Sequence, residues 1–166
     1  MDYLWTPWRY QYIAQAIAGK HSECIFCEVV ARNDDEVTLI VHRGKHCFII
    51  LNLYPYTSGH SMIVPYAHVA DLSLCDAATL AEMMQLSQTI ESILQRLYKP
   101  DGMNFGMNLG RAAGAGVSGH LHLHALPRWI GDANFMSVTA ETRVHPESLA
   151  TTYQRFREAF ASLKTK

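Results

Sequence analysis

The chain has no long hydrophobic run and no targeting segment. Its apolar stretch from Phe48 to Leu51 covers four residues, whereas a helix needs about 20 apolar residues to cross a bilayer. The N-terminal residues MDYLWTPWRY contain no basic segment followed by an apolar core, so they do not have the pattern of a secretory signal. These absences predict a cytoplasmic protein with no membrane partner.

The chain also has little net charge. Its 14 lysines and arginines nearly balance 15 aspartates and glutamates, which leaves a formal charge of -1. A broad cationic surface for duplex nucleic acid is therefore not expected. Small anions are still compatible with this composition.

Cysteine is scarce, with four residues in 166. Such a count does not build a disulfide framework in an intracellular chain of this size. Two of the four, Cys24 and Cys27, are separated by two residues. This spacing is half of a metal site, a redox couple, or a pair of buried thiols, and two more ligands are needed for the first of these.

No internal repeat, low-complexity tract or linker divides the sequence. With 49% hydrophobic residues over 166 positions, the chain can bury a core without disulfides or metals. We therefore predict a single domain over 1–166, with an N-terminal extension at 1–22 and a C-terminal helix at about 146–163. Within the extension, Thr6-Pro7 and Gly19 favour a short helix from Pro7 to Ala18.

The periodicity of the rest predicts an α+β fold with an antiparallel sheet, a long packing helix and terminal helices. β-branched and apolar runs indicate strands, with a hairpin through 43–45. Spacings of three and four between apolar residues indicate one long helix and a closing helix that His145 could cap. The predicted strands are 38–41, 47–51, 60–64, 104–109 and 120–126, and the two helices are 76–98 and 146–163.

Three histidines alternate with apolar residues in the last predicted strand. His120, His122 and His124 share one face because side chains alternate along a strand, and Leu121, Leu123 and Ala125 share the other. Two kinds of chemistry use such a row. The histidines could hold a catalytic metal, or one could be a nucleophile whose neighbours donate hydrogen bonds to a phosphate.

The segment before these histidines favours phosphate chemistry. Residues 108–119 contain glycines at 110, 114, 116 and 119, together with the amide of Asn108 and the hydroxyl of Ser118. Glycine lets backbone N–H groups approach an anion closely, because no Cβ stands in the way. The loop lacks the Gly-Lys-Ser/Thr ending of a nucleotide P-loop. Its position directly before the three histidines is therefore what indicates phosphate binding.

At this point the sequence resembles the histidine triad (HIT) superfamily. The family motif is His-x-His-x-His followed by two apolar residues, and residues 120–126 match it completely. The run from Asn52 to His60, followed by Ile63-Val64-Pro65, is similar to the nucleoside-pocket strand and turn of the family. The flanks at 4–9 and 127–135 resemble the bacterial branch that includes diadenosine tetraphosphate phosphorylases.

The resemblance implies a site that transfers a nucleotidyl group. His122 is expected to attack the α-phosphorus of a nucleotide, and His124 is expected to act as a donor to the phosphate or the leaving group, with His120 completing the triad. The resemblance also implies a set of nucleotide-binding residues. For two of them, Phe48 and Ile50, packing in the core is an equally good explanation. That set is Asn52 at the ribose, His60 at the nucleoside, Phe48 and Ile50 at the base, and Asn108, Gly116, Val117 and Ser118 at the phosphate.

The implied function is cleavage of dinucleoside polyphosphates, such as diadenosine tetraphosphate, through a covalent nucleotidyl-histidine intermediate. Two alternatives are a hydrolase of nucleoside phosphoramidates or adenylyl conjugates, and a nucleotide-binding module without turnover. An adenine nucleotide is the expected ligand. The resemblance further implies a homodimer that pairs through the long helix and the adjoining strand.

A structural zinc ion is a further implication of the resemblance. In zinc-bearing relatives a CxxC pair joins two histidines, and the corresponding residues of this chain are Cys24, Cys27, His68 and His120. Four protein ligands leave no position for water, so the zinc would stabilise the fold without taking part in the reaction. Cys47 and Cys75 are expected to be buried thiols.

Overall fold

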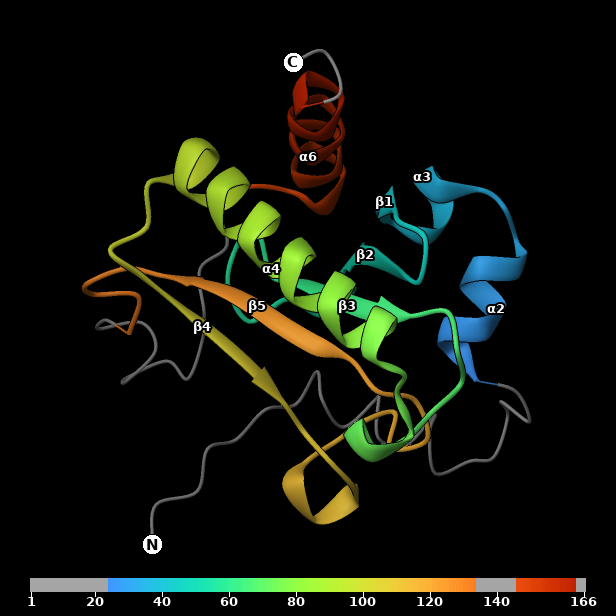
Figure 1. Cartoon of the computed structure of the whole chain (residues 1–166). Helices are drawn as coiled ribbons and strands as arrows, with labels where there is room; N and C mark the ends of the chain where they lie inside the picture. Colours follow the sequence, from blue (N-terminus) through green and yellow to red (C-terminus); the bar gives the residue numbers. More distant parts are fainter. Residues whose placement is uncertain (1–23, 134–145, 164–166) are drawn as a thin grey trace, which may run out of the picture.

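A computed structural model describes residues 24–133 and 146–163 of the chain. Within these two ranges, five strands form one sheet in which every neighbouring pair is antiparallel, in the order β1-β2-β3-β5-β4 (Figure 1). The predicted α+β class is confirmed. The predicted helix from Pro7 to Ala18 and the cap at His145 lie outside the described residues. The strands are β1 (Ile40–Arg43), β2 (Cys47–Leu51), β3 (Ser61–Pro65), β4 (Gly102–Met107) and β5 (Leu123–Arg128).

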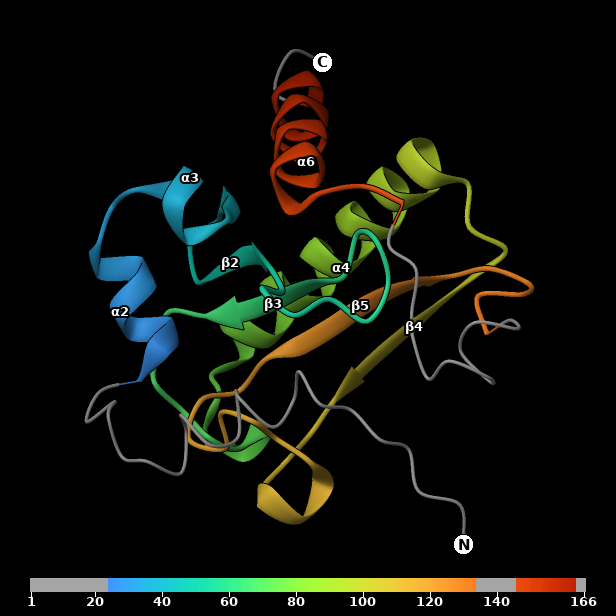
Figure 2. The same cartoon turned by 180° about the vertical axis from the view of Figure 1, so that it is seen from behind.

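The central strands are buried on both faces, and alternation sorts their side chains into two cores. On β2, Ile49 and Leu51 enter the larger core, whereas Phe48 and Ile50 enter the smaller one. The larger core lies beneath α4 (Ala77–Tyr98) and α6 (Leu149–Leu163). Helix α4 lies in front of the sheet in Figure 1 and behind it in Figure 2. The smaller core lies on the opposite face and includes Phe26 of α2 (Ile25–Ala31).

Helix α4 matches the predicted long helix within one residue. Asp76 caps its first turn by accepting a hydrogen bond from the Thr79 N–H at 2.8 Å, as an N-terminal aspartate does. Lys99 ends it in the left-handed conformation, immediately before Pro100. Its buried stripe packs on the sheet and consists of Thr79, Met83, Leu86, Ser87, Ile90, Ile93 and Leu94.

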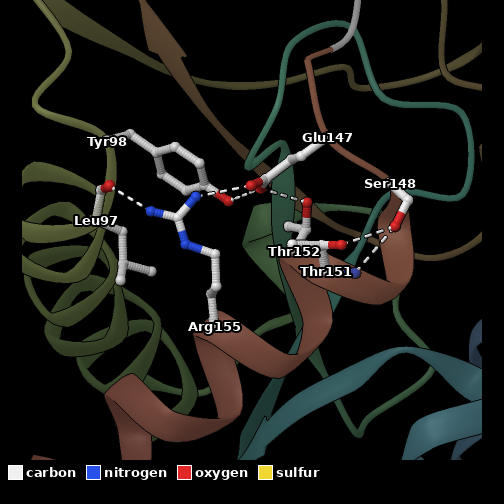
Figure 3. A network of polar contacts seen from close by, with 7 residues as sticks. All are labelled: Leu97, Tyr98, Glu147, Ser148, Thr151, Thr152 and Arg155. Atoms are coloured by element: carbon white, nitrogen blue, oxygen red, sulfur yellow. Dashed lines mark hydrogen bonds and ion pairs between the residues drawn. The ribbon is translucent and has the colours of Figure 1, made fainter.

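A polar network joins α6 to the end of α4 (Figure 3). The Glu147 carboxylate accepts hydrogen bonds from the Tyr98 hydroxyl and from Thr152 Oγ1, and it pairs with Arg155 at 2.7 Å. Arg155 also donates to the Leu97 carbonyl at 2.7 Å. Its guanidinium carbon lies 4.6 Å from the centre of the Tyr98 ring. These contacts satisfy a carbonyl at the end of α4 and fix where α6 begins.

Several predicted boundaries were wrong. Thr38 was expected in a strand, but it ends the short helix α3 (Asp35–Thr38), because the Asp34 carboxylate caps the Val37 N–H and Leu39 adopts a left-handed φ of 64°. Strand β5 begins at Leu123 instead of His120, since the preceding residues pair with no strand. Strand β4 is Gly102–Met107, not 104–109. The pattern missed α2, α3 and the short 3-10 helices Leu72–Leu74 and Arg111–Ala113.

None of the helices in the described ranges is long and apolar enough to cross a membrane.

Candidate active site and metal centre

A cavity of about 360 Å³ lies on the face of the sheet that α2 covers. Its walls come from α2, from the end of β2 and the turn after it, and from the glycine loop, so segments far apart in sequence meet here. The lining is mainly apolar, with a few polar groups, as is usual for small-molecule sites. The lining residues are Ile25, Phe26, Glu28, Val29, Arg32, Val37, Thr38, Leu39, Ile50, Leu51, Asn52, Leu53, Tyr54, Tyr56, Met62, Asn108, Gly114, Gly116, Val117, His122 and His124.

His122 lies in the cavity wall, and its hydrogen bond shows which ring nitrogen carries the proton. Its Nδ1 lies 2.8 Å from the carbonyl oxygen of His120. A carbonyl only accepts hydrogen bonds, so Nδ1 carries the proton. Burial lowers the pKa of His122, against a smaller opposing effect of that hydrogen bond. The imidazole is therefore neutral near pH 7, and the lone pair on Nε2 is available to an electrophile.

His124 receives its orientation from His60, which lies behind it. The Tyr56 N–H donates to His60 Nδ1 at 3.1 Å, so the proton of neutral His60 is on Nε2. That nitrogen lies 2.9 Å from His124 Nδ1, which must then accept. Neutral His124 consequently carries its proton on Nε2 and is a hydrogen-bond donor in the cavity wall.

Both rings of this pair are neutral at physiological pH. Burial, then the neighbouring His124 and His122, lowers the pKa of His60 to about 3. Burial, then His122, lowers the pKa of His124 to about 4. His124 is thus a neutral hydrogen-bond donor, and its N–H can stabilise negative charge that develops beside it.

The glycine loop lines the same cavity at Gly114, Gly116 and Val117. Gly110 and Gly114 have φ values of 76° and 87°, a backbone conformation that favours glycine. In the part of the chain that the structure describes, the backbone N–H groups of Gly116, Val117 and Ser118 make no hydrogen bond. Asn108 lies in the wall beside this loop. Free N–H groups of this kind form an anion-binding concavity.

Two thiols and two imidazoles gather at the N-terminus of α2. The ligand atoms of Cys24, Cys27, His68 and His120 all lie within 4.8 Å of one another. His120 Nδ1 is 3.2 Å from the sulfur of Cys24 and 3.7 Å from that of Cys27, and His68 Nδ1 is 3.4 Å from the sulfur of Cys27. Tetrahedral zinc with ordinary bond lengths separates sulfur and nitrogen ligands by about 3.5 Å. The donor set and its spacing therefore fit zinc.

The second nitrogen of His120 supports the same assignment. His120 Nε2 lies 2.9 Å from the Pro65 carbonyl and must donate to it, which leaves Nδ1 unprotonated toward the thiols. Metal-binding histidines commonly have such a carbonyl partner on the other nitrogen. Burial, together with Cys24, raises the pKa of the Cys27 thiol, and a bound divalent cation would reverse that effect.

The comparisons with known proteins agree with this geometry. A profile of the HIT domain matches residues 33–129. The chain belongs to the HIT domain family. A Mycobacterium tuberculosis relative named AP-4-A phosphorylase is 39% identical over 155 residues, which cover 90% of this chain and 79% of the relative.

Solved HIT proteins share the fold. A zinc-bound histidine triad family protein from Mycobacterium smegmatis superposes with a TM-score of 0.70 and 29% identity, covering 86% of this chain and 96% of that one. A hypothetical histidine triad nucleotide-binding protein from Sulfolobus tokodaii superposes with a TM-score of 0.68 and 29% identity, covering 85% of this chain and 94% of that one.

Most of the site residues that we expected from the sequence line the cavity, but not all. The structure places His122, His124, Asn52, Ile50, Asn108, Gly116 and Val117 in its wall. Phe48 is fully buried in the smaller core, where it packs against Tyr66 at 5.4 Å between ring centres. Ser118 is outside the lining set. His60 lies behind His124, and His120 belongs to the metal cluster.

Sequence reasoning missed the wall that α2 contributes. Ile25, Phe26 and Val29 line the cavity from this helix, with Arg32 at its end. Tyr54 and Tyr56 line it from the turn after β2. The apolar residues inside and just after the CxxC pair, at spacings of three and four, were the available signal for an amphipathic turn.

Proposed function

We propose that this HIT protein cleaves dinucleoside polyphosphates by nucleotidyl transfer through His122. The observation that carries the proposal is the tautomer of His122: its Nδ1 donates to a backbone carbonyl, so its Nε2 lone pair is free in the cavity wall beside His124. A nucleophilic imidazole needs that arrangement. The relative named AP-4-A phosphorylase supports the substrate class.

In the first step, His122 Nε2 forms a bond to the α-phosphorus and the bond from phosphorus to the bridging oxygen breaks. The polyphosphate leaves as an anion, and Nε2–H of His124 donates a hydrogen bond to the departing oxygen. The free N–H groups of residues 116–118 stabilise the charge on the equatorial oxygens. In the second step, the oxygen of water or inorganic phosphate attacks the phosphorus, the N–P bond breaks, and His122 returns to its neutral form. When water is the acceptor, it releases its proton to the solvent.

The nucleoside occupies the apolar part of the cavity in this proposal. We assign Asn52 to the ribose, because this residue lines the cavity and its amide nitrogen lies 3.4 Å from His60 Nε2. We assign Ile50 and the apolar side chains of α2 to the base. We propose adenine as the base on the strength of the relative's name.

Product analysis on diadenosine tetraphosphate tests this function and identifies the second acceptor. With phosphate present, ADP plus ATP indicates phosphorolysis, whereas AMP plus ATP indicates hydrolysis. Turnover of adenosine phosphoramidates or adenylyl conjugates, with none of the dinucleotide, would favour the alternative hydrolase. Binding of nucleotides without any turnover would leave the protein as a binding module.

Two assembly features belong to the same proposal. The cluster of Cys24, Cys27, His68 and His120 would hold a structural zinc ion, which adds its binding energy to folding. A homodimer is proposed through α4 and the adjoining strand β4. Strand β4 is at an edge of the sheet and exposes Phe105, and such an edge is a template for pairing. Metal analysis and the mass in solution test the two features, and a concentration-independent monomer would contradict the second.

A further inference from the structure

Helix α2 depends on tertiary contacts for its position. It has seven residues, and isolated helices of that length are unstable in water. Its single buried side chain is Phe26. Cys24 sits at the N-cap, but its side chain caps no N–H of the helix; its sulfur faces His120 instead. The contacts that hold the first turn are thus the Phe26 ring and the two cysteines on either side of it.

Phe26 touches the metal cluster, the nucleophile and the cavity at once. Its ring centre lies 5.3 Å from that of His120 and 5.2 Å from that of His122. The side chain is 5% exposed and also lines the cavity. Phe26 lies between Cys24 and Cys27 in sequence, so the metal cluster and this wall of the cavity share the first turn of α2.

From this juxtaposition we infer that metal binding and nucleotide binding strengthen each other, and that Phe26 is the positioning residue that couples them. A metal held by Cys24 and Cys27 fixes the first turn of α2, and with it the wall that Phe26 gives to the cavity. A nucleoside packed against Phe26 in turn holds the two thiols in their ligating positions. The inference rests on the proposed function, since a nucleotide is the occupant.

Reciprocity makes the coupling measurable from either side. If the metal raises nucleotide affinity by a given factor, the nucleotide must raise metal affinity by the same factor. Couplings between sites in proteins commonly span 5- to 150-fold, and we expect about 10-fold here. A purely structural zinc that leaves the cavity unchanged would give a factor of one.

The first experiment uses the zinc-loaded protein as purified. Transfer of zinc to excess chelator is followed at equilibrium with and without saturating AMP, and inorganic phosphate at the same concentration controls for direct binding of phosphate to zinc. AMP should raise zinc affinity about 10-fold, and phosphate should not. Equal zinc affinity in both conditions overturns the inference.

The second experiment measures AMP affinity calorimetrically for zinc-loaded and metal-free protein, below the melting temperature of the latter. The same factor of about 10 is expected. Equal affinities overturn the coupling and leave the proposed function standing, whereas no AMP binding to either form overturns both.

Substitutions on α2 locate the coupling. Phe26→Ala should keep one zinc per chain but reduce the factor toward one, and Phe26→Leu should restore part of it. Val30→Ala is the matched control, because Val30 packs against the same core and is outside the lining set. If Val30→Ala and Phe26→Ala lower the factor equally, a general loosening of α2 replaces Phe26 as the cause, and the inference for Phe26 is overturned.

Discussion

His120 and His122 come from one motif, two residues apart, and both are buried, yet their environments differ in kind. His120 has both ring nitrogens engaged, with Nδ1 facing two thiols and Nε2 donating to the Pro65 carbonyl. His122 uses only Nδ1, for the His120 carbonyl, and keeps Nε2 for the cavity. The partners of the two nitrogens, and not the residue type, separate a metal ligand from a nucleophile.

The largest expected effect comes from removing the imidazole of His122, whose Nε2 is the proposed nucleophile. His122→Ala should lower turnover of diadenosine tetraphosphate by ~10⁴-fold or more, because the covalent route is lost. AMP affinity should change little, since the other cavity walls remain. Steady-state kinetics and calorimetry check the two statements, and turnover close to that of the unmodified protein would remove His122 from its role.

His124 should matter less than His122, because it donates a hydrogen bond to the departing oxygen and does not itself bond to phosphorus. His124→Ala is expected to lower turnover by ~10²- to 10³-fold, the usual contribution of one hydrogen-bond donor to developing negative charge. A substrate with a less basic leaving group, which needs less stabilisation by a hydrogen bond, should recover most of that loss. An equal deficit on both kinds of substrate would contradict the assignment of His124 as the donor.

On the metal side of the comparison, loss of a ligand should affect stability more than chemistry. Cys24→Ser should abolish zinc binding and lower the melting temperature by about 10 °C. A substantial part of the turnover should survive below that temperature at saturating substrate. Loss of all turnover in the folded, metal-free protein, with recovery on adding zinc, would instead place the ion at the reaction centre.

Acidification should destabilise the fold through His60 and His124. Their pKa values fall to about 3 and about 4 in the folded chain, so between pH 6.5 and these values the unfolded chain binds more protons. Stability is full above pH 6.5 and declines as the pH falls, by up to ~1.4 kcal/mol per pH unit for each group. Denaturant titrations of the Cys24→Ser/Cys27→Ser protein avoid acid release of metal, and His60→Gln should flatten the slope.

The smallest effect is expected at the α4–α6 network, whose hydrogen bonds and ion pair include neither His120 nor His122. Tyr98→Phe removes the hydroxyl that donates to Glu147 and should cost about 1 kcal/mol of unfolding free energy. Turnover and zinc content should not change. A clear loss of turnover or of zinc would show that the position of α6 affects the cavity or the metal cluster.

The sequence predicted those parts of the site that depend on local pattern. Alternation placed Leu121, Leu123 and Ala125 in the larger core, which turns the histidines to the opposite face. Glycine content marked the loop that lines the cavity at Gly114, Gly116 and Val117, and β2 was predicted with its observed bounds. Such features follow from spacing and need no knowledge of distant contacts.

What the sequence did not predict depends on tertiary contacts. Phe48 and Ile50 share one face of β2, but only Ile50 reaches the cavity, because neighbouring elements cover Phe48. The wall from α2 was missed because its position depends on residues more than 90 positions away, such as His120 and His122. Tautomers likewise depend on partners that no local pattern reveals.

The central claim is that His122 carries the nucleotidyl group, and trapping that group tests it most directly. The protein is mixed with diadenosine tetraphosphate, quenched in base within the first turnover, and its intact mass and modified peptide are measured. The account predicts one adenylyl group per chain, located on His122 and missing from His122→Ala. Rapid turnover without an adduct, or an adduct on another residue that persists in His122→Ala, would contradict it.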